Sequence, residues 1–281
     1  MAQIINTNIM SLNAQRNLSA TQSALATSVQ RLSTGLRVNS AKDDAAGLAI
    51  AERMSTQVRG MNVAIRNAND AISLSQTAEG ALSKINDMGQ RMRELAVQSA
   101  NATNNESDRA SLNQEYQALA EEIKRNLAST SFNGTKLFAA GSALTFQVGA
   151  NNATTDQITI NLATITTDTD FTGALGTSTA SAPGISSFTF ATDALAKLDT
   201  MLAKVNSKRA EFGAIQNRFE AVIQTLQVSA ENQTAARSRI MDADFASETA
   251  ALTRAQVLQQ AGTAMLSQAN SLPNNVLSLL R

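Results

Sequence analysis

Residues 251–279, with the sequence ALTRAQVLQQAGTAMLSQANSLPNNVLSL, carry the most regular pattern in the chain. Small or apolar residues recur there in alternating steps of four and three. This is the heptad repeat of α-helices that pack along a narrow seam. Pro273 falls between two core positions of the repeat. We therefore predict a coiled-coil helix. Its predicted seam consists of Ala251, Ala255, Leu258, Gly262, Met265, Ala269, Leu272, Val276 and Leu279.

The N-terminal segment carries a matching pattern, with apolar residues at steps of seven, four, three and four. Its predicted seam consists of Leu18, Leu25, Val29, Leu32 and Leu36. Because single helices of this length are marginal in water, the two ends should pair and then bury further surface against other partners. We predict a terminal coiled-coil domain formed by residues 1–42 and 245–281.

Two short polar stretches interrupt the helical patterns. Asn39–Gly47 follows the N-terminal seam, and Asp242–Asp244 precedes the C-terminal one. We predict connectors over residues 43–57 and 236–244. Their carboxylates suit the first turn of a helix, where the helix dipole favours negative charge, better than they suit a metal site.

Long apolar faces at helical spacing lie between the connectors and predict an inner helical bundle from residues 58–140 and 190–235. Asn105 and Thr192 are the expected N-caps, because their side-chain oxygens can accept hydrogen bonds from free backbone N–H groups. The first 130 residues contain no proline, so nothing there breaks a long helix.

Residues 141–189 differ in character. Apolar and polar residues alternate over 144–148 and again over 158–162, and an Asn-rich loop joins the two stretches, which predicts a β-hairpin. Residues 163–187 are rich in Thr and Ser, and we expect a surface loop or short strands there. Whether that loop is bare or O-glycosylated stays open, because no motif decides it.

The order of these segments is nearly palindromic. It predicts a mainly α fold, an elongated rod whose terminal helices pair as a coiled coil and whose inner helical bundle is capped by a β-hairpin region. Only 4% of the residues are aromatic, with one Tyr and no Trp. That composition suits helices packed through small side chains better than a compact globular core.

The composition excludes several kinds of chemistry. The chain has no His and no Cys, so it cannot form disulfides, zinc sites of Cys and His, or a catalytic site with a Cys nucleophile or a His base. The sequence also lacks a Gly-rich phosphate-binding loop. We expect no enzymatic activity, no cofactor and no metal.

Charge and hydropathy argue against two kinds of partner. The 23 basic and 23 acidic residues give a net charge of +0, which provides no clustered positive field for nucleic acid. No apolar run approaches the roughly 20 residues that span a bilayer, so we expect no membrane partner. The start of the chain has neither the basic nor the apolar region of a cleaved secretory signal. Taken alone, that would indicate a cytoplasmic protein.

A series of motifs runs through both ends of the chain. They are Ile4–Asn8, Ser11–Leu18, Arg31–Arg37, Asn39–Gly47, Gln90–Gln98, Phe132–Gly134, Ser238–Ile240, Asp242–Ala246 and Gln268–Asn270. Together and in this order they resemble bacterial flagellin, over about residues 1–140 and 190–281. The short stretch between these arms leaves no room for the bulky outer domains of larger flagellins.

The resemblance implies a structural subunit that self-assembles into the flagellar filament for motility, by disorder-to-order pairing of its N- and C-terminal helices. Residues 1–42 and 245–281 would line the filament channel, and the inner bundle would form the next shell. The implied partners are many copies of the chain, the flagellar type III export apparatus, a flagellin export chaperone on the C-terminal helix, hook-associated proteins and the filament cap. The implied location is secreted and extracellular, which overrides the cytoplasmic interpretation.

The resemblance also implies recognition by the innate immune receptor Toll-like receptor 5 through Arg91, Leu95 and Glu115. Arg91 and Leu95 are four residues apart and share one helix face. Arg would supply forked hydrogen bonds and Leu an apolar anchor. The alternative role for these residues is subunit contact in the filament, and both roles are compatible.

Two other functions compete with the filament subunit. A hook–filament junction protein has similar ends and would form short capped assemblies. A signalling coiled coil, which is a different class of protein, would be a stable folded dimer in dilute solution and would lack the hairpin region.

Overall fold

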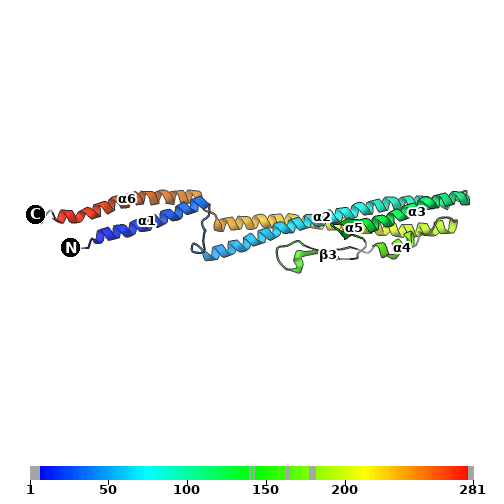
Figure 1. Cartoon of the computed structure of the whole chain (residues 1–281), viewed down its shortest axis with the longest axis horizontal. Helices are drawn as coiled ribbons and strands as arrows, with labels where there is room; N and C mark the ends of the chain where they lie inside the picture. The colour runs from blue at the N-terminus through cyan, green and yellow to red at the C-terminus, as the bar shows by residue number, and fades with distance from the viewer. Residues whose placement is uncertain (1–6, 139–140, 142, 163–164, 177–181, 278–281) are drawn as a thin grey trace. The chain divides into compact units, whose positions relative to one another are not determined.

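A computed structural model describes residues 7–138, 141, 143–162, 165–176 and 182–277, without the side chains of residues 167 and 272–277. That part of the chain is mainly helical, as the sequence predicts, and it contains six α-helices and two small antiparallel sheets (Figure 1). The chain divides into two compact units. The terminal unit comprises Met1–Thr56 and Glu231–Arg281, and the central unit comprises Gln57–Ala230.

In the terminal unit, α1 (Ile9–Thr34) and α6 (Phe245–Leu277) run antiparallel side by side, so that the start of α1 lies beside the last turns of α6. Asn8 caps α1 by accepting a hydrogen bond from the Ser11 backbone N–H at 3.1 Å. Gly35 ends the helix with a φ of 71°, a left-handed conformation that favours glycine. The predicted pairing of the two ends within one chain is therefore present.

The seam between α1 and α6 follows the heptad repeat, but its phase differs from the prediction at some positions. On α1 its buried or half-buried members are Ser11, Ala14, Leu18, Thr21, Leu25, Ser28 and Leu32. On α6 they include Glu248, Ala251, Leu252, Ala255, Gln259, Gly262, Leu266 and Ala269. Leu18 meets Gly262 closely, because a Cβ added at this glycine would lie 3.3 Å from Leu18 Cδ1.

Three predicted seam residues lie outside this seam. Val29, Leu258 and Met265 are 51%, 52% and 63% exposed. The reason is phase: Ser28 continues the four-and-three spacing of Leu18, Leu25 and Leu32, whereas Val29 is one residue too far round the helix.

The predicted seam also continues past both paired helices. Leu36 is half-buried just beyond α1. The side chains of Leu272 and Val276, and all of Leu279, lie outside the described part of the chain.

The breaks between helices are shorter than the predicted connectors 43–57 and 236–244. α2 (Ala45–Ser99) already begins at residue 45, and α5 (Phe188–Met241) continues to residue 241. The physical reason for the early start of α2 is a local cap, because the Asp44 carboxylate accepts a hydrogen bond from the Gly47 N–H at 2.8 Å.

The two non-helical links are bonded to each other within the terminal unit. The Arg37 N–H donates to the Met241 carbonyl at 2.6 Å, and the Ala243 N–H donates to the Gly35 carbonyl at 2.9 Å. These bonds flank an antiparallel bridge between Leu36 and Asp242. These bonds therefore tie the two links together where α1 ends and α6 begins.

The central unit is a three-helix bundle of α2, α3 (Glu106–Ser129) and α5. The predicted cap at Asn105 is present as a capping box with Asp108. The predicted cap at Thr192 is wrong, because α5 begins at Phe188 and Ser187 Oγ accepts from the Phe190 N–H at 3.3 Å. The fully buried large side chains of the unit include Leu82, Ile85, Met92, Tyr116, Ile123 and Phe219.

The predicted β-hairpin is present as β3 (Ala143–Gln147) and β4 (Gln157–Asn161), and the loop between them contains η1 (Thr154–Asp156). It packs on the helices through Phe146, whose ring meets that of Phe219 edge-on at 5.9 Å. The sequence analysis did not anticipate a second, smaller hairpin formed by β1 (Ser131–Phe132) and β2 (Thr135–Lys136). Its turn residues Asn133 and Gly134 have φ values of 47° and 80°, as a two-residue hairpin turn requires.

The expectation of a loop or short strands over residues 163–187 needs correction. The described part of this stretch contains η2 (Ile165–Thr167) and a short helix, α4 (Thr169–Leu175). α4 forms because Phe171, Ala174 and Leu175 share one helix face and are buried. Lys204 holds its start through an ion pair with Asp168 at 3.2 Å. The question of glycosylation falls partly on residues 163–164 and 177–181, which lie outside the described residues.

Candidate functional site

Two exposed surfaces, one on each unit, are the features from which function can be argued. Among the described residues, no group of three or more His, Cys, Asp or Glu side chains could hold a metal ion. In that same part of the chain, every helix falls short of the length and apolarity needed to cross a membrane.

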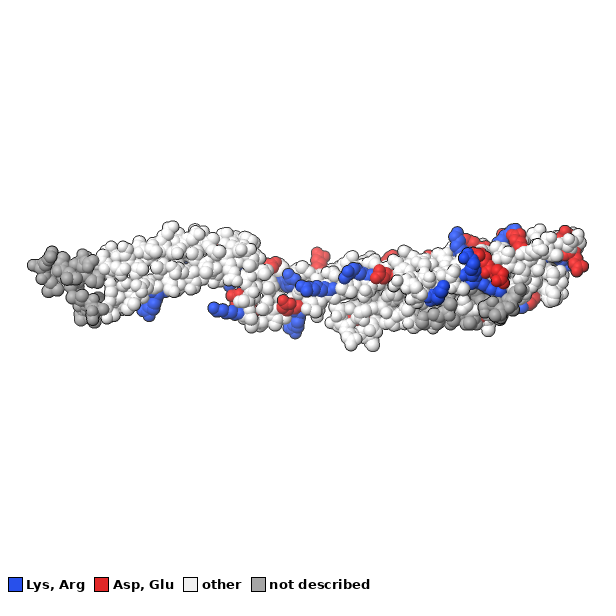
Figure 2. All heavy atoms as spheres, in the orientation of Figure 1, with Lys and Arg blue, Asp and Glu red and all other residues white. Residues whose placement is uncertain are grey.

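The first surface covers the helices of the terminal unit, and it is almost uncharged and exposes several large apolar side chains. Only four charged residues occur in α1 and α6 together, namely Arg16, Arg31, Glu248 and Arg254. Figure 2 shows one face of these helices almost free of charged side chains. Nine of the 14 exposed large hydrophobic side chains among the described residues lie on this unit. They are Ile9, Met10, Leu12, Val29, Ile50, Phe245, Val257, Leu258 and Met265.

A groove of about 360 Å³ runs between α1 and α6 on this surface. Met10 and Leu18 line it from α1, and Leu258, Gly262 and Met265 line it from α6. The two predicted seam residues of α6 that are exposed, Leu258 and Met265, therefore form a wall of this groove. Helices that are apolar on faces beyond their mutual seam are normally buried in a larger structure.

Polar contacts hold the two helices in register at both ends of the seam. Asn8 Nδ2 donates to the Ala269 carbonyl, and Ser11 Oγ donates to Asn270 Oδ1, both at 2.7 Å. At the opposite end, Arg31 lies 3.7 Å from Glu248. A helix shifted by one heptad would lose all of these contacts.

The second surface lies on the central unit, where α2 faces α3. Arg91 Nε donates to Glu115 Oε1 at 2.9 Å, and Arg91 Nη1 donates to Glu94 Oε2 at 3.0 Å. The hydrogen bond to Glu115, followed by the one to Glu94, raises the pKa of the Arg91 guanidinium. All three side chains are exposed, so the pair Arg91–Glu115 is a surface feature that joins two helices.

Leu95, the third predicted receptor residue, does not share this surface. Its side chain is 1% exposed and belongs to the core of the bundle. The reason is visible in the sequence, because Leu95 continues the apolar face of Ile85 and Met92. A receptor could not use Leu95 as an apolar anchor in this structure, because the side chain packs α2 against the core of the bundle.

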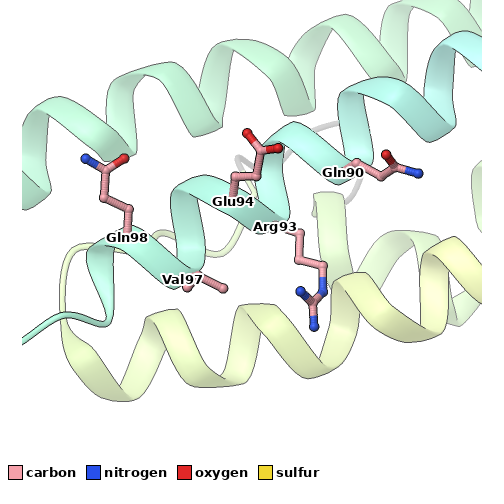
Figure 3. A pocket seen from close by; sticks show the side chains of 5 residues that line it. All are labelled: Gln90, Arg93, Glu94, Val97 and Gln98. Carbon is pink, nitrogen blue, oxygen red and sulfur yellow. The ribbon is translucent and has the colours of Figure 1, made fainter.

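Other residues of the Gln90–Gln98 motif, which the sequence analysis did not assign to receptor recognition, do reach the surface of α2. Gln90, Arg93, Glu94, Val97 and Gln98 line a shallow depression of about 510 Å³ on α2. Figure 3 shows Arg93 extending toward α5, whereas Glu94 points to the other side of α2. Arg93 Nε donates to Asp199 Oδ1 at 2.7 Å, and this bond raises the pKa of the Arg93 guanidinium. Val97, which is 50% exposed, is the apolar side chain that reaches solvent here. The sequence could have identified Val97 as exposed, because it lies outside the helix face that Met92 and Leu95 turn toward the core.

Comparison with known proteins bears on both surfaces. Residues 5–143 match the family described as bacterial flagellin N-terminal helical region, and residues 195–280 match bacterial flagellin C-terminal helical region. These matches include α1 and α6, and also Arg91 and Glu115.

Relatives match over nearly the whole chain. A flagellin of Halalkalibacterium halodurans is 46% identical over 99% of this chain and 100% of its own length. A flagellin of Bacillus subtilis is 41% identical over 99% of each chain. A solved structure assigned as a flagellar hook-associated protein from Vibrio parahaemolyticus is similar in fold, with a TM-score of 0.60 and 14% identity over 71% of this chain and 100% of that one. On the two family matches and these identities, the chain belongs to the bacterial flagellins, the structural proteins of the flagellar filament.

Proposed function

We propose that the chain assembles with copies of itself into the flagellar filament, and that α1 and α6 become ordered as a pair when the copies pack. The observation that carries this proposal is the set of exposed apolar side chains on a terminal unit with very few charges. An isolated chain leaves that surface in water, whereas a homopolymer would bury it, with a gain of roughly 25 cal/mol per Å² of apolar area.

The composition of the seam supports the disorder-to-order step. On α1, the seam positions other than Leu18, Leu25 and Leu32 are Ser, Ala or Thr. Fixing the backbone of each residue costs about 1–2 kcal/mol of conformational entropy. A half-buried seam with so few large side chains offsets little of that cost. Contacts with further copies would supply the remainder, so the ends should be disordered in the free chain.

Family resemblance motivates the route to the filament. The chain would leave the cell through the flagellar type III export apparatus, after an export chaperone has held its C-terminal helix. It would then act outside the cell, in a filament bounded by hook-associated proteins and the filament cap. The absence of Cys is compatible with this route, because an unfolded chain without thiols cannot form wrong disulfides in an oxidising environment.

Recognition by Toll-like receptor 5 is proposed on the second surface. The exposed pair Arg91–Glu115 offers a charged, forked donor beside a carboxylate, and Val97 offers an apolar contact on the same helix. Leu95 would act indirectly, by holding α2 against the core.

Seeded polymerisation tests the assembly proposal. Monomeric chain is mixed with sheared filament seeds and imaged by electron microscopy, and its far-ultraviolet circular dichroism is recorded before and after. We expect long filaments and a gain in helix. Short capped assemblies would favour the junction protein. A stable helical dimer that forms no filaments would favour the signalling coiled coil.

A receptor reporter assay tests the recognition proposal. Cells that signal through the receptor are exposed to the wild-type chain, Arg91→Ala, Glu115→Ala and the control Arg125→Ala. Arg125 is similarly exposed and pairs within α3 with Glu122. Loss of signalling in the first two variants but not in the control is expected. Equal signalling by all four proteins would remove Arg91 and Glu115 from the recognition site.

A further inference from the structure

Two methionines on the terminal unit differ from the other described methionines. Met10 and Met265 are each 63% exposed, and both line the groove between α1 and α6. Met61, Met92 and Met201 are buried. The remaining described methionines are half-buried. The two most exposed methionines of the described chain thus share one mostly apolar groove.

We propose that Met10 and Met265 form an oxidation-sensitive site, and that their conversion to methionine sulfoxide by peroxides blocks filament assembly. This inference rests on the proposed function, since it assumes that a second copy of the chain covers the groove. The chain has no Cys, so exposed thioethers are its most readily oxidised sulfur atoms.

The chemistry at each site is a two-electron oxygen transfer. The thioether sulfur attacks one oxygen of hydrogen peroxide and the O–O bond breaks. The attacked oxygen gives up its proton, and the other oxygen takes up a proton and leaves as water. Sulfur is oxidised to the sulfoxide while peroxide is reduced to water. Methionine sulfoxide reductases reverse the change, which makes the site switchable.

Oxidation of Met10 and Met265 should affect assembly because of where these side chains lie. In the groove they lie among apolar side chains such as Leu18 and Leu258, and the side-chain donors that line it, Asn13, Asn17 and Thr21, are all on α1. A sulfoxide oxygen is a strong acceptor that holds water, and burying it against the apolar part of the groove, where none of these donors reaches it, is unfavourable. A free chain keeps that oxygen in water, whereas an assembled chain would have to desolvate it. Oxidation should therefore act on assembly and leave the central unit folded.

Peptide mapping tests where oxidation occurs. The free chain is treated briefly with hydrogen peroxide, digested with trypsin and analysed by mass spectrometry. Cleavage after arginine and lysine gives a peptide of residues 255–281 whose one methionine is Met265. Peptides 198–204 and 60–66 contain the buried Met201 and Met61 as matched controls. Met10 is resolved from Met1 by fragment ions. We expect oxidation at Met10 and Met265 at least about tenfold faster than at the controls.

Assembly assays test the consequence. Peroxide-treated wild type should need an at least about tenfold higher concentration to elongate seeds. Treatment with methionine sulfoxide reductases should restore elongation. The double variant Met10→Leu, Met265→Leu keeps apolar side chains of similar volume, and it should elongate seeds equally well with and without peroxide.

The outcomes separate this inference from the proposed function. If untreated wild type forms no filaments, the proposed function fails. If wild type assembles, but peroxide inhibits the double leucine variant equally, the oxidation site lies elsewhere and the inference fails. It also fails if Met10 and Met265 oxidise no faster than Met61 and Met201, or if the reductases do not restore assembly of oxidised wild type.

Discussion

The two units of this chain use long helices in opposite ways. The central unit buries its large side chains fully, with Leu82, Ile85, Met92 and Phe219 all 0% exposed. The terminal unit pairs two helices through a half-buried seam and leaves side chains such as Leu258 and Met265 in solvent. One unit has completed its core within the chain, and the other has not.

Charge follows the same division. In the central unit, cross-helix ion pairs such as Arg91–Glu115, Arg93–Asp199 and Glu79–Arg209 lie over a complete core. On α1 and α6, Arg31–Glu248 is the one described ion pair. A surface with so few charges does not repel a neighbouring copy and loses little on desolvation. The complete core and the proposed assembly surface therefore lie in different units.

The largest expected effect comes from placing a charge on the incomplete unit. Leu258→Asp puts a carboxylate in the groove wall, where a second copy would bury it without a partner, so assembly should be abolished. The central unit should unfold at the same urea concentration as in wild type. Seeded elongation and urea titration of the full chain measure the two effects. Leu258→Met is the control and should assemble. Normal filaments from the aspartate variant would show that this groove stays open to water.

Phe219→Ala probes the complete core. Phe219 is 0% exposed and packs edge-on against Phe146 of the hairpin, so its truncation should cost about 3–5 kcal/mol of unfolding free energy. Urea unfolding followed by circular dichroism measures the loss. Phe188→Ala, at a side chain that is 56% exposed, should change the unfolding free energy by less than about 0.5 kcal/mol. Similar losses in both variants would contradict the assignment of the core.

The sequence predicts the helices, the hairpin and the pairing of the ends, because periodicity reports which faces must be buried. The sequence predicts less accurately which residues of a helix face its partner, and it does not predict the short elements. Ser28 rather than Val29 enters the seam, because Ser28 continues the spacing of Leu18, Leu25 and Leu32 on the face that meets α6. The sequence analysis missed α4 because seven residues are too few for a periodic signal.

The candidate recognition site shows the same limit. Arg91 and Glu115 lie together at the surface of the bundle, whereas Leu95, which the sequence analysis placed on the same face as Arg91, continues the core face. A single helix face can hold both an exposed Arg and a buried Leu, since residues four apart differ by about 40° around the axis. At the edge of a core, about 40° of rotation decides whether a side chain is buried or exposed. A spacing of four residues in the sequence does not show on which side of that edge each residue lies.

Alkaline pH should weaken the complete core through its one tyrosine. Burial, and secondarily the negative charge of Asp193, raises the pKa of Tyr116 to about 12. The neutral phenol is therefore favoured in the fold, and its contribution is fully present below the unfolded pKa of about 10 and is lost as pH rises toward 12. At a pH of about 11 the loss should be about 1.4 kcal/mol.

The measurement is urea unfolding of wild type and Tyr116→Phe between neutral and alkaline pH, with the phenolate followed by ultraviolet absorbance. Only the wild type carries this titration, so the difference between the two curves isolates it. Parallel loss of stability in both proteins would mean that Tyr116 titrates in the fold as it does in water.

The smallest expected effect lies at the turn between α2 and α3. Asn105 accepts from the Asp108 N–H at 2.8 Å, and Asp108 accepts from the Asn105 N–H at 3.2 Å. Asn105→Ala removes half of this capping box and should cost about 1 kcal/mol of unfolding free energy. Asn69→Ala is the control at an exposed position inside α2, where alanine is a good helix former and the change should be neutral or slightly stabilising. The cap stabilises the central unit alone, so filament elongation by Asn105→Ala should match wild type. A defect in elongation equal to that of Leu258→Asp would mean that folding and assembly are not separated between the two units.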